Sequence, residues 1–159
     1  MIQRLFPLTS TVPVLKRGPN SQIGQSRGGK TTKIHTLVDA LGNPLYFLLT
    51  GGQCHDGVQA FDLLKGVDLQ NVNVIGDRAY NATELRQHIV DRGGSYTIPP
   101  RMNFKDPWET DWWLFKERHL IECFFNKLKH FRHLSTRFDK LAASFLAFIQ
   151  IGAIFLLIK

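Results

Sequence analysis

Acidic residues are missing from the first quarter of the chain, where no Asp or Glu occurs before Asp39. With several prolines and glycines in the same stretch, this composition predicts a basic, poorly ordered arm over residues 1–22, with one strand in Thr9–Leu15. The 159 residues together carry a formal charge of +7, which favours an anionic partner such as nucleic acid. The basic residues of the acid-free stretch are Arg4, Lys16, Arg17, Arg27, Lys30 and Lys33.

Cysteine is also scarce, since Cys54 and Cys123 are the only two and stand far apart. They have no metal-ligand spacing and make no disulfide framework, so we read them as free thiols of a reducing compartment. The apolar N-terminal segment is short and is broken by Pro7 and Pro13, so no signal peptide is predicted. We expect a cytoplasmic protein of a bacterium.

One long apolar run is present, Leu141–Ile158, between Lys140 and Lys159. Its length reaches the lower limit for a membrane span. The rest of the chain has the pattern of a globular domain, so we expect a buried C-terminal helix and no membrane contact. A small membrane-associated protein is the alternative.

The remaining chain alternates short apolar runs with segments of helical spacing. A turn at residues 39–43 joins two strands into a hairpin, and later helices begin near Asp56 and Asn81, which we expect to act as caps. The order predicts one α/β domain, a mixed sheet with flanking helices. The predicted strands are Thr32–Val38, Pro44–Thr50, Val72–Gly76 and Ser95–Ile98, and a long helix is predicted from Leu114 to Phe131.

Asp77 directly follows the buried strand Val72–Gly76. The carboxyl ends of strands in open α/β sheets are where ligands and metals gather. A carboxylate at this point is therefore a candidate functional group, and a turn or capping role is the alternative.

Three charged residues lie along one border of the long helix. At about 100° per residue, Arg118, Glu122 and Lys129 fall between the apolar and the solvent-facing sides. Such a position lets a side chain be held by packing and still reach a substrate. A surface salt bridge between Arg118 and Glu122 explains the same pattern.

These residues also match a family signature. Arg118, Glu122 and Lys129 fit the Y-x-x-R-x-x-x-E-x-x-x-x-x-x-K pattern of bacterial insertion-sequence DDE transposases, with Phe115 in place of the tyrosine. Three blocks resemble the same family in the same order, and the resemblance covers residues 23–159. The blocks are SRGGKTTKIHTLVDALGNPLYFLLTGGQCHD, VIGDRAYNATELRQHI and ERHLIECFFNKLKHFRHLSTRFDKLA.

This resemblance implies a ribonuclease-H-like catalytic domain that cleaves DNA phosphodiesters and transfers strands with Mg²⁺ or Mn²⁺. Asp77 and Glu122 match the second and third metal-binding acids, and Arg118 and Lys129 match basic positions suited to phosphate. Thr9 stands where the family has its first acid, and Asp39 falls in the hairpin turn, where we expect a structural role. The chain thus resembles an incomplete, N-terminally truncated transposase. We expect it to be inactive alone, and to be a homo-oligomer on DNA; the alternative is a non-catalytic DNA-binding remnant that competes with or poisons an active transposase.

Other residues are candidates for DNA contact. The tryptophans Trp108, Trp112 and Trp113 can stack on bases or pack over the sheet edge. Cys54-His55-Asp56 is interpreted as a helix start, not a metal site. The basic candidates for contact with the DNA backbone are Arg27, Lys30, Lys33, Arg132, Arg137 and Lys140.

Overall fold

This computed structural model describes residues 3–14, 22–27 and 29–158. The strands form one six-stranded mixed sheet. β1 lies inside the sheet, antiparallel to β3 on one side and parallel to β5 on the other. β6 continues the sheet beyond β5 in parallel, while β2 and β4 both pair with β3. The strands are β1 (Gln3–Pro13), β2 (Gly24–Ser26), β3 (Gly29–Val38), β4 (Pro44–Gly51), β5 (Val72–Ile75) and β6 (Ser95–Thr97).

β1 differs from the expected arm. The predicted strand over Thr9–Leu15 begins already at Gln3, and Leu15 lies outside the described residues. β1 pairs with β3 in a register from Phe6 opposite Val38 to Pro13 opposite Thr31. The two prolines of β1 concealed this strand, since proline is disfavoured inside a sheet.

The hairpin of β3 and β4 is confirmed. At its turn the Asp39 carboxylate accepts hydrogen bonds from the backbone N–H groups of Leu41 and Asn43, at 2.8 and 2.9 Å. Gly42 adopts a φ of +83°, which L-residues with a side chain rarely take. Asp39 therefore has the structural role that its position predicted.

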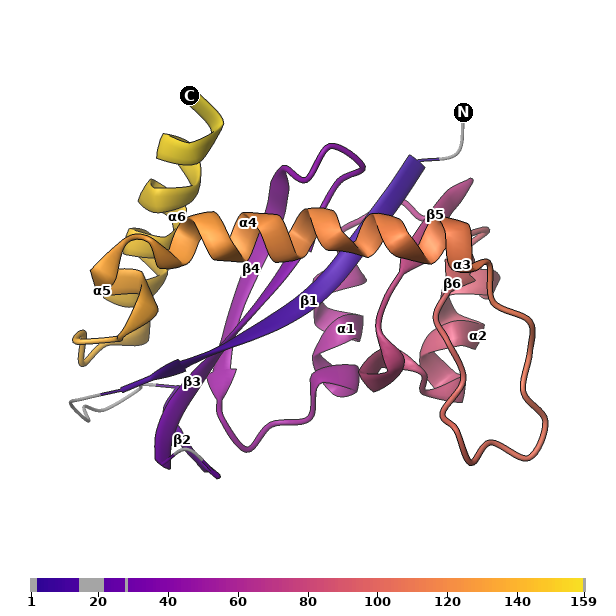
Figure 1. Cartoon of the computed structure of the whole chain (residues 1–159), viewed down its shortest axis with the longest axis horizontal. Coiled ribbons are helices and arrows are strands. Elements are labelled where there is room, and N and C mark those ends of the chain that lie inside the picture. The colour runs from indigo at the N-terminus through magenta and orange to yellow at the C-terminus, as the bar shows by residue number, and fades with distance from the viewer. Residues whose placement is uncertain (1–2, 15–21, 28, 159) are drawn as a thin grey trace.

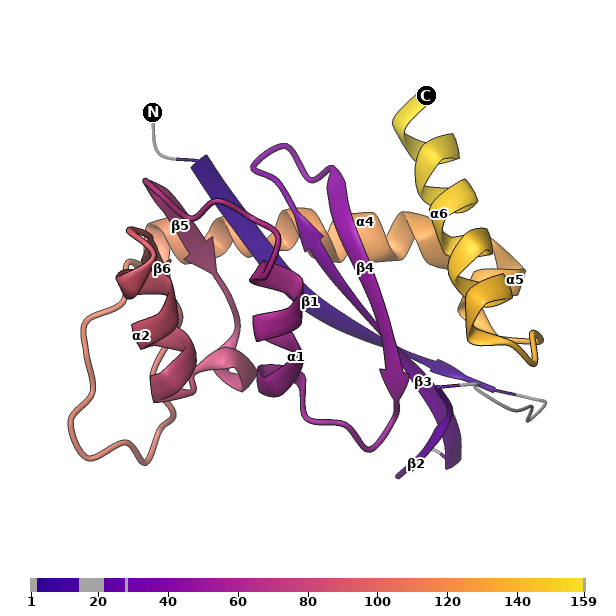
Figure 2. The same cartoon turned by 180° about the vertical axis from the view of Figure 1, so that it is seen from behind.

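Helices cover both faces of the sheet. α4 lies across one face, seen in front in Figure 1, and α1 and α2 cover the other, seen in front in Figure 2. The long helix expected from Leu114 is divided into an α-helical turn, a 3₁₀ turn and α4. The helices are α1 (Asp56–Leu64), η1 (Arg78–Tyr80), α2 (Thr83–Asp91), α3 (Trp112–Phe115), η2 (Lys116–Arg118), α4 (His119–Lys129), α5 (Arg132–Ser135) and α6 (Ala142–Ile158).

Two expected helix caps are wrong. Asp56 is the first residue of α1, and its carboxylate pairs with Lys33 instead of capping a backbone N–H. Asn81 is buried ahead of α2, whose N-cap is Ala82. Asp56 pairs with a residue distant in the chain and Asn81 is buried, so neither side chain forms the local cap that the sequence pattern favoured.

The sheet separates two hydrophobic cores. Strand alternation sends Ile34 and Val38 of β3 toward α4 and α6, and Leu37 toward α1 and α2. On the α4 side, Ile121, Phe125 and Leu128 are almost completely buried. This packing fixes which face of α4 can meet solvent or a ligand.

α6 is a helix, as expected, but only one side of it is covered. Phe145, Ile149 and Ala153 pack in the core beside α4, while Ile151 and Ile158 are 61% and 81% exposed. The expectation of a buried helix is therefore correct for one side of α6 and wrong for the other. No helix in the described part of the chain combines the length and the apolar character needed to cross a membrane.

Candidate active site

Asp77 stands just beyond the carboxyl end of β5. The strand is buried at every position, and Gly76 carries the chain from it to the acid. One oxygen of the Asp77 carboxylate, Oδ1, accepts a hydrogen bond from the backbone N–H of Ala79 at 2.8 Å. The carboxylate is thus held in place by the first turn of η1, which confirms its capping role, and this hydrogen bond involves only one of its two oxygens.

A cavity of about 340 Å³ opens beside this carboxylate. Asp77 and Arg78 line it from the β5 side, and Trp112 and Phe115 line it from α3. The two aromatic rings meet edge to face, with centroids 5.6 Å apart. The strand tip and the segment leading into α4, remote in sequence, therefore share one hollow.

The Arg118 guanidinium contacts both Phe115, which lines this cavity, and Glu122. Its Cζ atom lies 5.4 Å from the centroid of the Phe115 ring, and its Nη1 is 2.7 Å from Glu122 Oε1. The salt bridge that the helical spacing offered as an alternative is thus present. Its two side chains are 24% and 47% exposed, so both remain reachable from solvent.

Lys129 lies in the last turn of α4, exposed, on the same helix border. Seven residues of helix separate it from Glu122, which is about 10 Å along the axis. Glu122 is not among the residues that line the cavity at Asp77. The shared metal site of these two acids, which the family resemblance implies, stays a prediction.

The backbone of Thr9 lies on the strand next to Asp77. β1 and β5 run parallel, with Gln3 level with Val72 and Leu5 level with Val74. Continued along both strands, this register brings Thr9 close to the level of Asp77. On its other side Thr9 is opposite His35 of β3.

His35 is completely buried and its Nε2 lies 2.7 Å from the Thr50 hydroxyl oxygen. Burial lowers the pKa of His35 to about 4; the nearby Asp56 acts in the opposite direction and Lys33 adds to the lowering. The imidazole is therefore neutral at pH 7 and acts as a polar part of the core.

The basic candidates for DNA contact fall into three groups. Arg137 is completely buried, and its guanidinium donates to Thr32 Oγ1 at 2.7 Å and to the Asp139 carbonyl at 3.0 Å, so the expected DNA contact is wrong. Lys33 is half-buried and paired with Asp56 at 2.8 Å. The exposed candidates are Arg27, Lys30, Arg132 and Lys140.

The three tryptophans also differ in how far they are exposed. Trp108 packs at the sheet edge: its indole N–H donates to the Ile98 carbonyl at 2.9 Å, and Arg86 lies 3.8 Å from its ring centroid. Trp112 and Trp113 are 55% and 73% exposed. Only the latter two keep a face for another molecule.

The profile of the family described as "Transposase DDE domain" matches residues 10–158. The chain belongs to this family. The transposase domain is 41% identical over 124 residues to a Brucella ovis protein named as a transposase for insertion sequence element IS6501, covering 77% of this chain and 94% of the relative. It is 33% identical over 147 residues to a Burkholderia cepacia protein named as a transposase for element IS402, covering 86% of this chain and 66% of that protein.

Among solved structures, this transposase domain is similar to piggyBac transposase in a synaptic complex with hairpin DNA. The TM-score is 0.49 at 16% identity, over 64% of this chain and 24% of the other. The sequence resemblance to insertion-sequence transposases is thus confirmed by the family profile and by both relatives.

The sequence did not predict that Trp112 lines the same cavity as Asp77 in this transposase domain. It indicated Trp112 only as a residue that stacks on bases or packs over the sheet edge. Trp112 is three residues before Phe115, a spacing that puts both on one side of a helical turn. That spacing is the signal that could have linked Trp112 to the residues matching the family signature.

Proposed function

We propose that this chain is a ribonuclease-H-like catalytic domain for insertion-sequence transposition that binds DNA but does not cleave it alone. Asp77 and Glu122 are its retained metal-binding acids, and Arg118 and Lys129 contact phosphate groups. The observation that carries the proposal is the position of Asp77, at the tip of a buried strand and beside a cavity shared with the segment that leads to Glu122.

The acids present do not complete a two-metal site. Divalent ions in such sites activate the attacking water or 3′-hydroxyl and stabilise the leaving oxygen, and they need negative ligands on both ions. Asp77 and Glu122 supply only two of the three carboxylates that the family resemblance implies, so we assign no cleavage step to this chain as it stands.

Thr9 accounts for the missing ligand. Its backbone lies on β1, the parallel neighbour of the strand that ends at Asp77. Extended beyond Leu5 and Val74, the register of these parallel strands puts position 9 close to the level of Asp77, so an acid there would be near Asp77. A threonine hydroxyl is neutral and is a poor substitute for a carboxylate toward a hard cation.

Nicking of supercoiled plasmid in Mn²⁺ tests this proposal, together with Mn²⁺ affinity measured directly. We expect the unmodified chain to leave the plasmid intact, Thr9→Asp to bind Mn²⁺ more tightly and nick it, and Thr9→Asp combined with Glu122→Gln to lose both gains. Efficient nicking by the unmodified chain that disappears in Glu122→Gln would contradict the assignment of the missing acid.

A second candidate function is competition with an active transposase. Exposed cations from two separate parts of the chain, Arg27 and Lys30 near β2 and Arg132 and Lys140 near α5, support binding to DNA without cleavage. Added to a cleavage reaction of a catalytically complete relative, such a chain lowers the yield in proportion to its concentration. Unchanged yield at saturating concentration would remove this candidate.

A further inference from the structure

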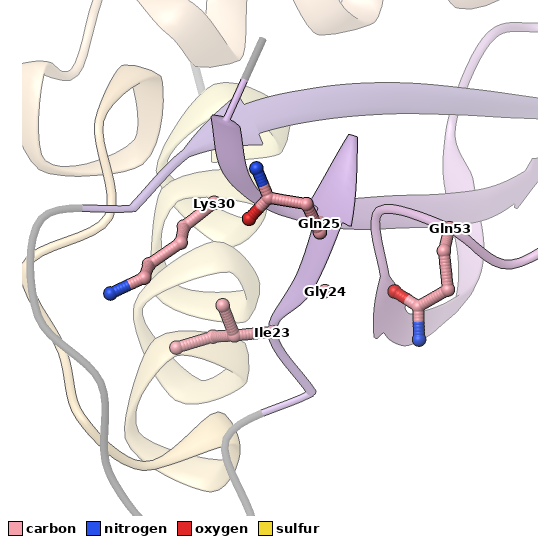
Figure 3. A pocket seen from close by; sticks show the side chains of 5 residues that line it. All are labelled: Ile23, Gly24, Gln25, Lys30 and Gln53. Carbon is pink, nitrogen blue, oxygen red and sulfur yellow. The ribbon is translucent and has the colours of Figure 1, made fainter. Parts of the chain in front are cut away.

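Three elements meet at a corner of the sheet remote from Asp77. β2, the first residues of β3 and the turn after β4 surround a cavity of about 350 Å³. Figure 3 shows the side chains that line it, with Lys30 and Ile23 on one side of β2 and Gln53 on the other in this view. The corner lies at the free end of the β3 hairpin, away from α1 and α2 (Figures 1 and 2).

Three polar side chains of this corner have no hydrogen-bond partner among the described residues. Gln25, Lys30 and Gln53 are all exposed, and their side chains make no hydrogen bond or ion pair with the residues that the structure describes. Each amide presents one donor and one acceptor side by side. A ligand that matches such a pair carries an acceptor and a donor of its own, as the edge of a nucleobase does.

Glycines give Gln53 its position. A Cβ atom on Gly24 would overlap the Gln53 amide oxygen, and one on Gly51 would stand 2.6 Å from it. A Cβ on Gly52 would overlap the Thr31 hydroxyl. The absence of side chains lets the Gln53 amide lie directly against the backbone of two strands, which restricts where it can point.

Gln25 and Lys30 are set together by the sheet register. β2 and β3 are antiparallel with Gln25 directly opposite Lys30, so both side chains leave the same face of the ribbon. Among the described residues the sheet narrows toward this end: β4 pairs with β3 only as far as Thr32, and β1 reaches Lys30, whose carbonyl accepts a hydrogen bond from the Val14 N–H at 3.0 Å. At the outermost pair, Ser26 opposite Gly29, the described part of the sheet consists of β2 and β3, and a two-stranded ribbon has the width that the DNA major groove admits.

The charge of the ribbon suits the same partner. Arg27 is exposed at its tip and Lys30 on its face, and no Asp or Glu occurs in the chain before Asp39. The local field is therefore positive where the phosphate backbones would flank the groove.

We infer that the β2–β3 ribbon enters the major groove of DNA, where Gln25 and Gln53 read base edges and Lys30 contacts a guanine edge or a phosphate. This inference rests on the proposed DNA binding and adds a sequence preference to it. Glutamine pairs with the N6 and N7 atoms of adenine, and lysine with O6 and N7 of guanine.

Selection from a random duplex library by the whole purified chain tests the inference. We expect the unmodified chain to enrich a motif and to bind it about tenfold or more tightly than a scrambled duplex. The Gln25→Ala, Gln53→Ala double variant should lose that preference and keep its background affinity, while Gln150→Ala, an exposed glutamine of α6, should change neither. Replacing purines of the motif by 7-deazapurines should weaken binding of the unmodified chain alone.

The same motif enriched equally by the double variant would overturn the inference. So would an unmodified chain that binds DNA in a salt-dependent way but enriches no motif, and that outcome would leave the proposed DNA binding intact. Absence of any DNA binding at low salt would overturn both. For Lys30→Ala, we expect the slope of log affinity against log salt to become shallower by about 1, and no change for the matched exposed Lys65→Ala.

Discussion

The buried guanidinium of Arg137 joins segments that are far apart in the chain. It donates to the Thr32 hydroxyl of β3 and lies 5.1 Å from the ring centroid of Phe145 in α6. The backbone N–H of the same residue donates to the Pro13 carbonyl at the end of β1. Through its side chain and its backbone N–H, this one residue thus ties two strands to the start of the last helix.

We predict that Arg137→Ala lowers the free energy of unfolding by about 3 kcal/mol, because it removes a buried charged donor and its packing at once. Arg132→Ala, at an exposed position, should change it by less than about 0.5 kcal/mol. Urea unfolding measures both. DNA affinity should follow the reverse order, and a folded Arg137→Ala chain with sharply reduced DNA affinity would contradict the assignment.

His35 gives the fold a dependence on acid. Above pH 6.5 the imidazole is neutral in the folded and the unfolded chain and has no effect on stability. Between pH 6.5 and about 4 only the unfolded chain takes up the proton, since burial holds the pKa of the folded state at about 4. Stability is lost as the pH falls through this window, by about 3 kcal/mol in total.

We predict that His35→Gln flattens this part of the curve. Glutamine can keep a hydrogen bond to Thr50 and does not titrate. The difference in unfolding free energy between pH 7 and pH 4.5 should be smaller in the variant than in the unmodified chain, with both measured by urea titration. Equal differences would show that His35 is not the responsible group.

At the scale of single residues, the sequence predicted a role correctly where the partners are adjacent in the chain and wrongly where they are distant. Asp39 was placed correctly because its partners, Leu41 and Asn43, are adjacent in the chain. Arg137 was misplaced because its partners come from β3 and α6, and nothing local distinguishes a buried arginine from an exposed one. Contacts of this kind depend on the tertiary fold.

At the scale of elements, composition alone did not predict which side of α6 is buried. Every residue of Ala142–Ile158 is uncharged, so the sequence alone could not say which face is covered. The packing against α4 decides it: Ile149 is buried completely, while its neighbour Ile151 is 61% exposed.

We therefore predict that Ile149→Ala lowers the unfolding free energy by about 3 kcal/mol, the usual effect of emptying a packed site. The same substitution at Ile151 should change it by less than about 1 kcal/mol and raise solubility. Thermal or urea unfolding of the two variants makes a matched comparison on one helix. Similar losses at both positions would indicate that the outer face is also covered in solution.

Most strands and helices could be predicted from the sequence, because their apolar periodicity is local. Strands such as Val72–Ile75 and Ser95–Thr97 lie within one residue of their predicted ends. β1 was predicted too short, since its prolines and basic neighbours are typical of irregular chain. Its stability comes from pairing with β3 and β5, which no local pattern records.

For the whole molecule, charge is the main predictor of DNA binding. The net charge is +7, and four exposed candidates remain after the burial of Arg137 and the pairing of Lys33. If about four phosphates are contacted, log affinity for duplex DNA should fall with log salt at a slope near −3.6. Fluorescence anisotropy from low to moderate salt measures this slope, and a flat response would reject the electrostatic footprint.

The place of β1 in the sheet has a consequence for synthesis. This strand is synthesised before its partners, since Gln3 pairs with Val72, and the Pro13 carbonyl accepts a hydrogen bond from the backbone N–H of Arg137. Until those partners emerge, the nascent chain exposes unpaired backbone groups that can join other chains. Pairing of β1 with β5 therefore waits until Val72–Ile75 has been synthesised, and rapid production at high temperature favours aggregation over correct pairing.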